Sequence, residues 1–201
     1  MDLQSALQNF EKHGFHAVSF ETKEEASAYL NAAIDGVSVA YGGSMTIAQM
    51  GLLDLLKTHN DVIGHWDIPA GMSKAEVYAK AAVTDVYLTS ANGASETGEL
   101  VNIDGFGNRV SSSLFGHKKV YFIVGVNKLE PTLDKAIWRA RNIASPKNAQ
   151  RLNRKTPCAA KGDRCYDCNS PERICNGILI HARKMSSCEM EIVFVNEPLG
   201  F

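Results

Sequence analysis

At 201 residues, of which 45% are hydrophobic and 21% charged, the chain has an ordinary globular composition, which excludes a disordered or fibrous protein. Its 21 lysines and arginines balance 22 aspartates and glutamates, so it lacks the positive charge that a nucleic-acid backbone attracts. No signal-peptide pattern is present, and no apolar run is long enough to span a bilayer. We therefore expect a cytoplasmic protein with one domain over residues 1–201, which contacts neither nucleic acid nor membrane and folds alone or as a homo-oligomer.

Helix and strand patterns alternate along the first half of the chain. The apolar periodicity predicts helices over residues 2–13, 22–34, 44–56 and 73–82, and strands over residues 16–20, 37–41, 62–66 and 85–90. This alternation is typical of the α/β class, in which a mostly parallel sheet is flanked by helices.

The pattern changes after residue 95. Residues 100–103 and the glycine-containing turn at 104–108 resemble a hairpin inserted into the winding, which would make the sheet mixed. Further elements are predicted as strands over residues 120–124, 178–182 and 191–195 and a helix over residues 132–143. We expect both closing strands to return to the sheet.

A cysteine-rich segment, residues 145–176, lacks any periodicity and is predicted to be a long loop. Four cysteines lie in it with the spacing C-x6-C-x2-C-x6-C: Cys158, Cys165, Cys168 and Cys175. The central C-x2-C pair allows two thiolates to share one metal ion, and the flanking cysteines complete four ligands. The spacing fits zinc and an iron–sulfur cluster alike, and the alternative is four unrelated thiols.

A glycine-containing loop follows the predicted strand at 37–41. Its glycines permit close backbone approach, and its hydroxyls can bind a phosphate or carboxylate; the candidates are Gly42, Gly43, Ser44 and Thr46. The alternative is a tight turn in which Ser44 caps the next helix. The loop matches neither the Walker nor the dinucleotide fingerprint, so the sequence carries no NAD or ATP motif.

Two more polar loops follow core strands. Ser90, Asn92 and Gly93 come after the strand at 85–90, and Asn127 and Lys128 come after the strand at 120–124. Because ligands of parallel sheets bind at the carboxyl ends of the strands, we expect these residues to bind a small anionic metabolite. The alternative for a lysine in this position is a solvated surface residue.

Glu99 is the candidate catalytic residue. In an extended segment it shares one face with Val101 and Ile103, which places its carboxylate at the rim of an apolar surface. A carboxylate in that position can act as a general acid or base or as a nucleophile. The alternative is a glutamate that hydrogen-bonds to loop amides.

Taken together, these segments resemble the lactate-utilization (LUD) domain family. The resemblance extends over nearly the whole chain and rests on the segments Gly42-Gly43-Ser44-Met45-Thr46, Ser90-Ala91-Asn92-Gly93, Glu96-Thr97-Gly98-Glu99-Leu100-Val101, Gly125-Val126-Asn127-Lys128, Pro131-Thr132-Leu133-Asp134 and Thr156-Pro157-Cys158 through Cys175-Asn176. The chain is most similar to the lactate utilization protein C type, in a subgroup with a C-terminal four-cysteine cluster. That type does not require the cysteines, so residues 158–175 depart from it.

The resemblance implies a fold and a role. The fold would be similar to the ribose-5-phosphate isomerase and CoA-transferase group, an α/β sheet with an inserted hairpin. The role would be that of an accessory or catalytic subunit in the oxidation of lactate or another organic acid, beside a partner subunit with iron–sulfur clusters. Two alternatives stay open: a sugar-phosphate isomerase or CoA-transferase-like enzyme that uses Glu99, and a metabolite sensor without enzymatic activity.

Overall fold

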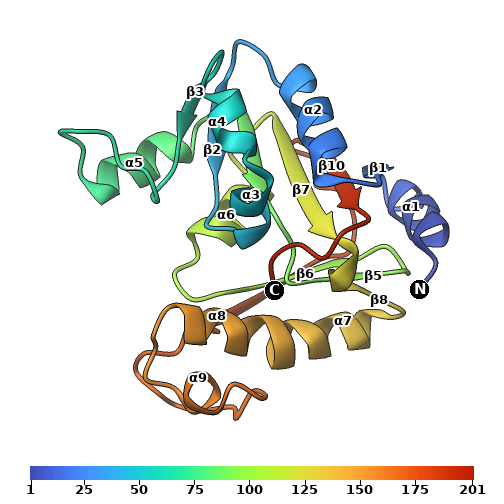
Figure 1. Cartoon of the computed structure of the whole chain (residues 1–201), viewed down its shortest axis with the longest axis vertical. Helices are drawn as coiled ribbons and strands as arrows, with labels where there is room; N and C mark the ends of the chain where they lie inside the picture. Colours follow the sequence, from blue (N-terminus) through green and yellow to red (C-terminus); the bar gives the residue numbers. More distant parts are fainter.

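In the computed structural model, which describes residues 1–201, two sheets stack between layers of helices (Figure 1). In chain order the elements are α1 (Leu3–Lys12), β1 (His16–Phe20), α2 (Lys23–Ala33), β2 (Ser38–Tyr41), α3 (Met45–Met50), α4 (Leu52–Leu56), β3 (Asp61–Ile63), α5 (Lys74–Ala81), β4 (Val86–Thr89), β5 (Gly93–Ser95), β6 (Leu100–Asp104), α6 (Asn108–Leu114), β7 (Lys119–Gly125), a 3-10 turn (Val126–Lys128), β8 (Leu129–Glu130), α7 (Leu133–Arg139), a π-helical turn (Ala140–Ala144), α8 (Ser145–Arg151), α9 (Pro157–Lys161), β9 (Gly177–His181) and β10 (Glu189–Val195).

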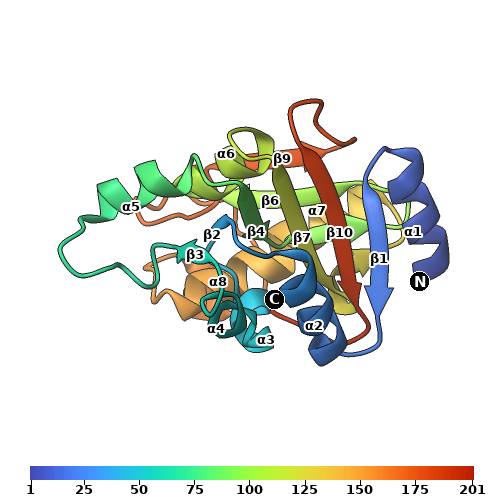
Figure 2. The same cartoon turned by 90° about the horizontal axis from the view of Figure 1, so that it is seen from above.

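The main sheet has six parallel strands in the order β1-β10-β7-β4-β2-β3, and Figure 2 shows them side by side. Alternate residues of β7 enter two different hydrophobic clusters. Phe122 and Val124 pack with α1 and the second sheet, whereas Tyr121 and Ile123 pack with α2, α3 and α4. Both faces of the sheet are therefore covered, as all-parallel sheets require, and the predicted α/β fold is confirmed.

The second sheet has the order β8-β5-β6-β9 and lies between the main sheet and α7. Strand β5 pairs with β6 antiparallel and with β8 parallel. One face of this sheet contributes Ala94 and Leu100 to the core shared with β7, and the other packs Val101 against Ala136 of α7. In Figure 1, α7 and α8 run beneath these strands.

Gly93 allows the close contact between β5 and α7. A Cβ at this position would lie 2.6 Å from the backbone carbonyl oxygen of Ala136, closer than real contacts allow. We therefore expect Gly93→Ala to lower the free energy of unfolding by about 2 kcal/mol, because strand and helix must separate. Gly177→Ala in β9 of the same sheet is the matched control, since its nearest atom would be 3.9 Å away. Equal chemical denaturation midpoints for the two variants would contradict this account.

The inserted hairpin exists, but its turn is not the predicted one at 104–108. The turn lies at residues 96–99, between β5 and β6. Residues 104–108 instead lead into α6, because the Asp104 carboxylate accepts hydrogen bonds from the backbone N–H groups of Phe106 (3.1 Å) and Gly107 (3.2 Å). This local bonding starts a helix rather than a return strand.

Three further predictions on the fold are corrected. Gly51, with φ of 64°, divides the helix predicted at 44–56 into α3 and α4. The loop predicted over 145–176 contains α8 and α9, since Pro146 and Pro157 occupy first-turn positions where no backbone N–H is needed. Strand β9 joins β6 of the second sheet rather than the main sheet. None of the helices has the length and apolar character that crossing a membrane requires.

Candidate anion-binding site

The loops after β2, β4 and β7 meet at one edge of the main sheet, because these three strands are neighbours and parallel. Lys128 lies at the centre of this meeting point. Its Nζ donates to Thr46 Oγ1 at 2.7 Å and to Ser90 Oγ at 3.0 Å. The Ser90 hydroxyl in turn donates to Thr46 Oγ1 at 3.3 Å. Thr46, in the first turn of α3, and Ser90, after β4, thus both bond to the ammonium group of Lys128.

Lys128 is not the solvated lysine that its position after a strand would suggest. Its side chain is 3% exposed, and burial, together with the nearby charges of Arg139 and Arg109, lowers its pKa to about 7. Lys128, Thr46 and Ser90 line a pocket of about 70 Å³, which offers space for a few water molecules or one carboxylate-sized group. A buried cation beside an empty volume of this size favours a small anion.

Two arginines that the sequence patterns did not single out complete the positive charge. Arg109 of α6 lines the pocket and donates to the side-chain oxygens of Asn102 at 2.7 Å and Asn92 at 3.2 Å. Arg139 of α7 is 3% exposed and donates to the carbonyl oxygens of Asn92 at 2.7 Å and Asn127 at 3.0 Å. Arg139 had a signal in the sequence, since it stands one turn from Ala136 on the apolar face of its helix; Arg109 had none.

The last residues of the chain cover the Lys128 pocket. Gly200 donates its N–H to Gln49 Oε1 at 2.7 Å, and a Cβ at Gly200 would lie 3.1 Å from Lys128 Nζ. Asn127 holds this segment, because its Oδ1 accepts the N–H of Leu199 at 3.1 Å. Asn127 therefore lies beside the site and positions its cover, and it does not line the pocket.

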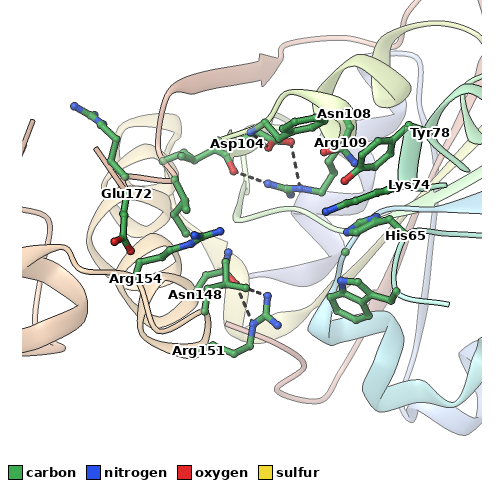
Figure 3. Close-up of a pocket in the computed structure, with 18 of the residues that line it drawn as sticks. His65, Lys74, Tyr78, Asp104, Asn108, Arg109, Asn148, Arg151, Arg154 and Glu172 are labelled. Carbon is green, nitrogen blue, oxygen red and sulfur yellow. Dashed lines mark hydrogen bonds and ion pairs between the residues drawn. The ribbon is translucent and has the colours of Figure 1, made fainter. Parts of the chain in front are cut away.

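A wider cleft of about 610 Å³ adjoins the pocket (Figure 3). Four residues line both spaces: Gly43, Arg109, Asn148 and Arg151. Gly43 allows the aromatic rings of His65 and Trp66 to close against the loop after β2, since a Cβ there would be 3.2 Å from each.

The remaining residues of the loop after β2 have local packing roles. Ser44 caps α3, accepting the Ile47 N–H at 3.4 Å, while it also lines the pocket. Gly42 lies under Tyr87, where a Cβ would be 2.6 Å from the phenol oxygen. For Ser44, capping and pocket lining thus occur together.

Glu99 and Gly93 lie apart from this site. Glu99 stands at the tip of the β5–β6 hairpin, where its Oε2 accepts the hydroxyl protons of Thr97 and Ser95. It lines neither the Lys128 pocket nor the adjoining cleft. Gly93 faces α7, as described above. The hydrogen bonds of Glu99 are those of a residue that stabilises its own turn.

The four cysteines of the C-terminal segment are free thiols, and each is partly exposed. Thiols suit zinc or an iron–sulfur cluster, but no group of three or more histidine, cysteine, aspartate or glutamate side chains lies together here as a metal ligand set. Arg173 contacts two of the four, donating to the carbonyl oxygen of Cys168 at 2.7 Å and to Cys175 Sγ at 3.4 Å. Metal binding at Cys158, Cys165, Cys168 and Cys175 stays a prediction.

The Lys128 pocket lies at the carboxyl ends of parallel strands, which is where α/β proteins bind ligands. The chain belongs to the LUD domain family, whose model matches residues 3–195. Among solved structures it is similar to a DUF162 family protein from Deinococcus radiodurans, with a TM-score of 0.54, 13% sequence identity, and coverage of 98% of this chain and 99% of that chain. At this identity the likeness shows a shared fold alone. No match was found among curated proteins.

Proposed function

We propose that this LUD domain protein is a lactate-utilization-like protein of the cytoplasm that binds a small 2-hydroxy or 2-oxo carboxylate in the Lys128 pocket during organic-acid oxidation. Lys128 carries the proposal, because burial beside two arginines is costly for an ammonium unless an anion offsets the charge. Membership of the LUD family supports the organic-acid part.

The groups around the pocket suit such an acid. A carboxylate can accept a charge-assisted hydrogen bond from Lys128, and the hydroxyls of Thr46 and Ser90 can bond to an oxygen on the neighbouring carbon. Most donors of Arg109 and Arg139 are already bonded to protein oxygens, so these side chains contribute mainly their positive charge.

Calorimetric titration with L-lactate and pyruvate tests the proposal. We expect a dissociation constant below about 10 mM for at least one of them. Lactamide, which has a similar shape without the charge, should show no binding. Glu99→Gln is the control variant and should bind as the unaltered protein does, since Glu99 is bonded within its own hairpin. Absence of heat with both acids, or equal binding of lactamide, would overturn the proposal.

We also propose that the four cysteines bind zinc or an iron–sulfur cluster, on the strength of their C-x6-C-x2-C-x6-C spacing and their free thiols. Protein purified without oxygen should contain stoichiometric zinc or iron, measured by elemental analysis and absorption. Cys168→Ala should lose the metal, whereas Cys188→Ala should keep it, because Cys188 is buried in the main core. Metal-free protein would contradict this proposal, and zinc in place of iron would exclude the iron–sulfur cluster.

A further inference from the structure

The cleft beside the Lys128 pocket has features that a three-carbon acid does not need. Its volume of about 610 Å³ lies in the range of sites for much larger ligands. Of its charged lining residues, five are basic and two acidic: Lys74, Arg109, Arg151, Arg154 and Arg173 against Asp104 and Glu172. The whole chain, in contrast, has a net charge of −1. Positive charge is thus concentrated on this cleft.

Four of these basic side chains have no acidic partner. The eleven ion pairs of the molecule include none that involves Lys74, Arg151, Arg154 or Arg173. In Figure 3, Lys74 and Arg109 extend from one side of the cleft, and Arg151 and Arg154 lie on the other. Such an arrangement can hold a ligand with several negative charges between the two walls.

Aromatic rings form a row along the same cleft, which we call the aromatic row: Trp66, His65, Tyr78 and Phe106. Tyr78 stacks on Phe106 with ring centroids 5.2 Å apart, and His65 lies 5.6 Å from Tyr78. Phe106 is 75% exposed and Trp66 42% exposed, so ring faces remain available. Aromatic faces of this kind stack on planar bases.

The basic groups lie directly beside these rings. The Arg151 guanidinium is 5.6 Å from the Trp66 ring, and Lys74 Nζ is 5.6 Å from the Tyr78 ring. A ligand that stacks on the aromatic row therefore places any attached anionic groups within reach of these cations. This neighbourhood matches a planar base linked to a chain of phosphates.

We infer that the cleft is a second binding site, next to the Lys128 pocket, for a nucleotide with two or more phosphates. Side chains provide the recognition, because the sequence has no Walker loop or dinucleotide fingerprint. Arg151 and Arg154 bind the phosphates, and the aromatic row binds the base. The site adjoins the proposed carboxylate pocket through Gly43 and Arg109, yet most of its lining residues are different.

Titration with ADP, adenosine and inorganic pyrophosphate, each without metal, tests this inference. ADP should bind at least tenfold more tightly than adenosine, which lacks the charge, and than pyrophosphate, which lacks the ring. The double variant Arg151→Gln/Arg154→Gln should bind ADP at least tenfold more weakly. Tyr78→Leu should lower the affinity for ADP to the affinity for pyrophosphate. Arg183→Gln, an exposed arginine outside the cleft, is the control.

Three results would overturn the inference: no ADP binding, equal affinity for ADP and pyrophosphate, or unchanged ADP affinity in the double variant. Circular dichroism melting of each variant checks that the fold is retained. For the double variant we expect an unchanged melting temperature, because both arginines are exposed. Pyruvate titration of the single variant Arg154→Gln, whose side chain lines the cleft and not the Lys128 pocket, separates the two sites. Weaker ADP binding with intact pyruvate binding supports the cleft as a site of its own. If the unaltered protein binds ADP but not pyruvate, only the carboxylate proposal is contradicted.

Discussion

Replacement of Lys128 by methionine should reduce the affinity of the pocket for pyruvate or L-lactate at least tenfold. The ammonium is the charged donor at the centre of the pocket, and a hydrogen bond to a charged group is worth about 1.5–3 kcal/mol. Methionine keeps the length and apolar stem of the side chain and removes the charge and its N–H donors. Calorimetric titration of the variant measures the effect.

The same substitution should leave the fold stable. Removal of Lys128 relieves a buried ammonium group, and Ser90 and Thr46 can still bond to each other. We therefore expect a melting temperature at or above that of the unaltered protein. Lys135→Met on the exposed surface of α7 is the control for binding and should change nothing. Unchanged pyruvate affinity in Lys128→Met would remove the basis of the carboxylate proposal.

Arg139→Met should lower the free energy of unfolding by about 3 kcal/mol. The guanidinium donates to the backbone oxygens of Asn92, Asn127 and Phe201, so it connects the residue before β5, the 3-10 turn after β7 and the segment after β10. Methionine cannot donate, so these acceptors lose a charged partner in a buried site. For a chain of this length the change corresponds to a fall in melting temperature of about 10 °C.

Arg141→Met provides the comparison for Arg139. Arg141 is two residues further along the chain, 41% exposed, and pairs at 3.3 Å with an aspartate that is itself 79% exposed. Exposed ion pairs of this kind contribute about 0–1 kcal/mol. The two variants should therefore separate clearly in thermal denaturation. A fall of similar size in both would show that Arg139 does not hold the three segments together.

Local sequence patterns predicted the main sheet well. The alternation of helix and strand signals fixed the parallel arrangement, and this arrangement alone brings Thr46, Ser90 and Lys128 together. The second sheet was harder, because the pairing of Leu100 with His181 joins residues far apart in the sequence and leaves no local pattern. The sequence therefore predicted the strand β9 but assigned it to the wrong sheet.

The sequence predicted where the site lies, but not the burial of Lys128 or which charged side chains reach the pocket. The burial of Lys128 depends on the segment around Gly200, which covers it and carries no recognisable motif. Arg109 reaches the pocket only because residues 104–108 begin a helix instead of closing a hairpin. Glu99 was placed on an extended face with Val101, but Gly98, with φ of 98°, turns the chain immediately before it. Each outcome depended on tertiary contacts or on a turn type that the periodicity does not encode.

The pH dependence of pyruvate binding tests the role of Lys128 most directly. Pyruvate stays ionised between pH 6 and 9, and Lys128 is the only lysine among the pocket-lining residues, which include no histidine, cysteine or tyrosine. With the Lys128 pKa near 7, the charged form that binds the anion is lost as the pH rises through and above 7. Affinity should therefore fall above pH 7 by up to about tenfold per pH unit, and Lys128→Met should show a weak, flat profile. Pyruvate affinity that stays constant from pH 6 to 9 in the unaltered protein would contradict the account.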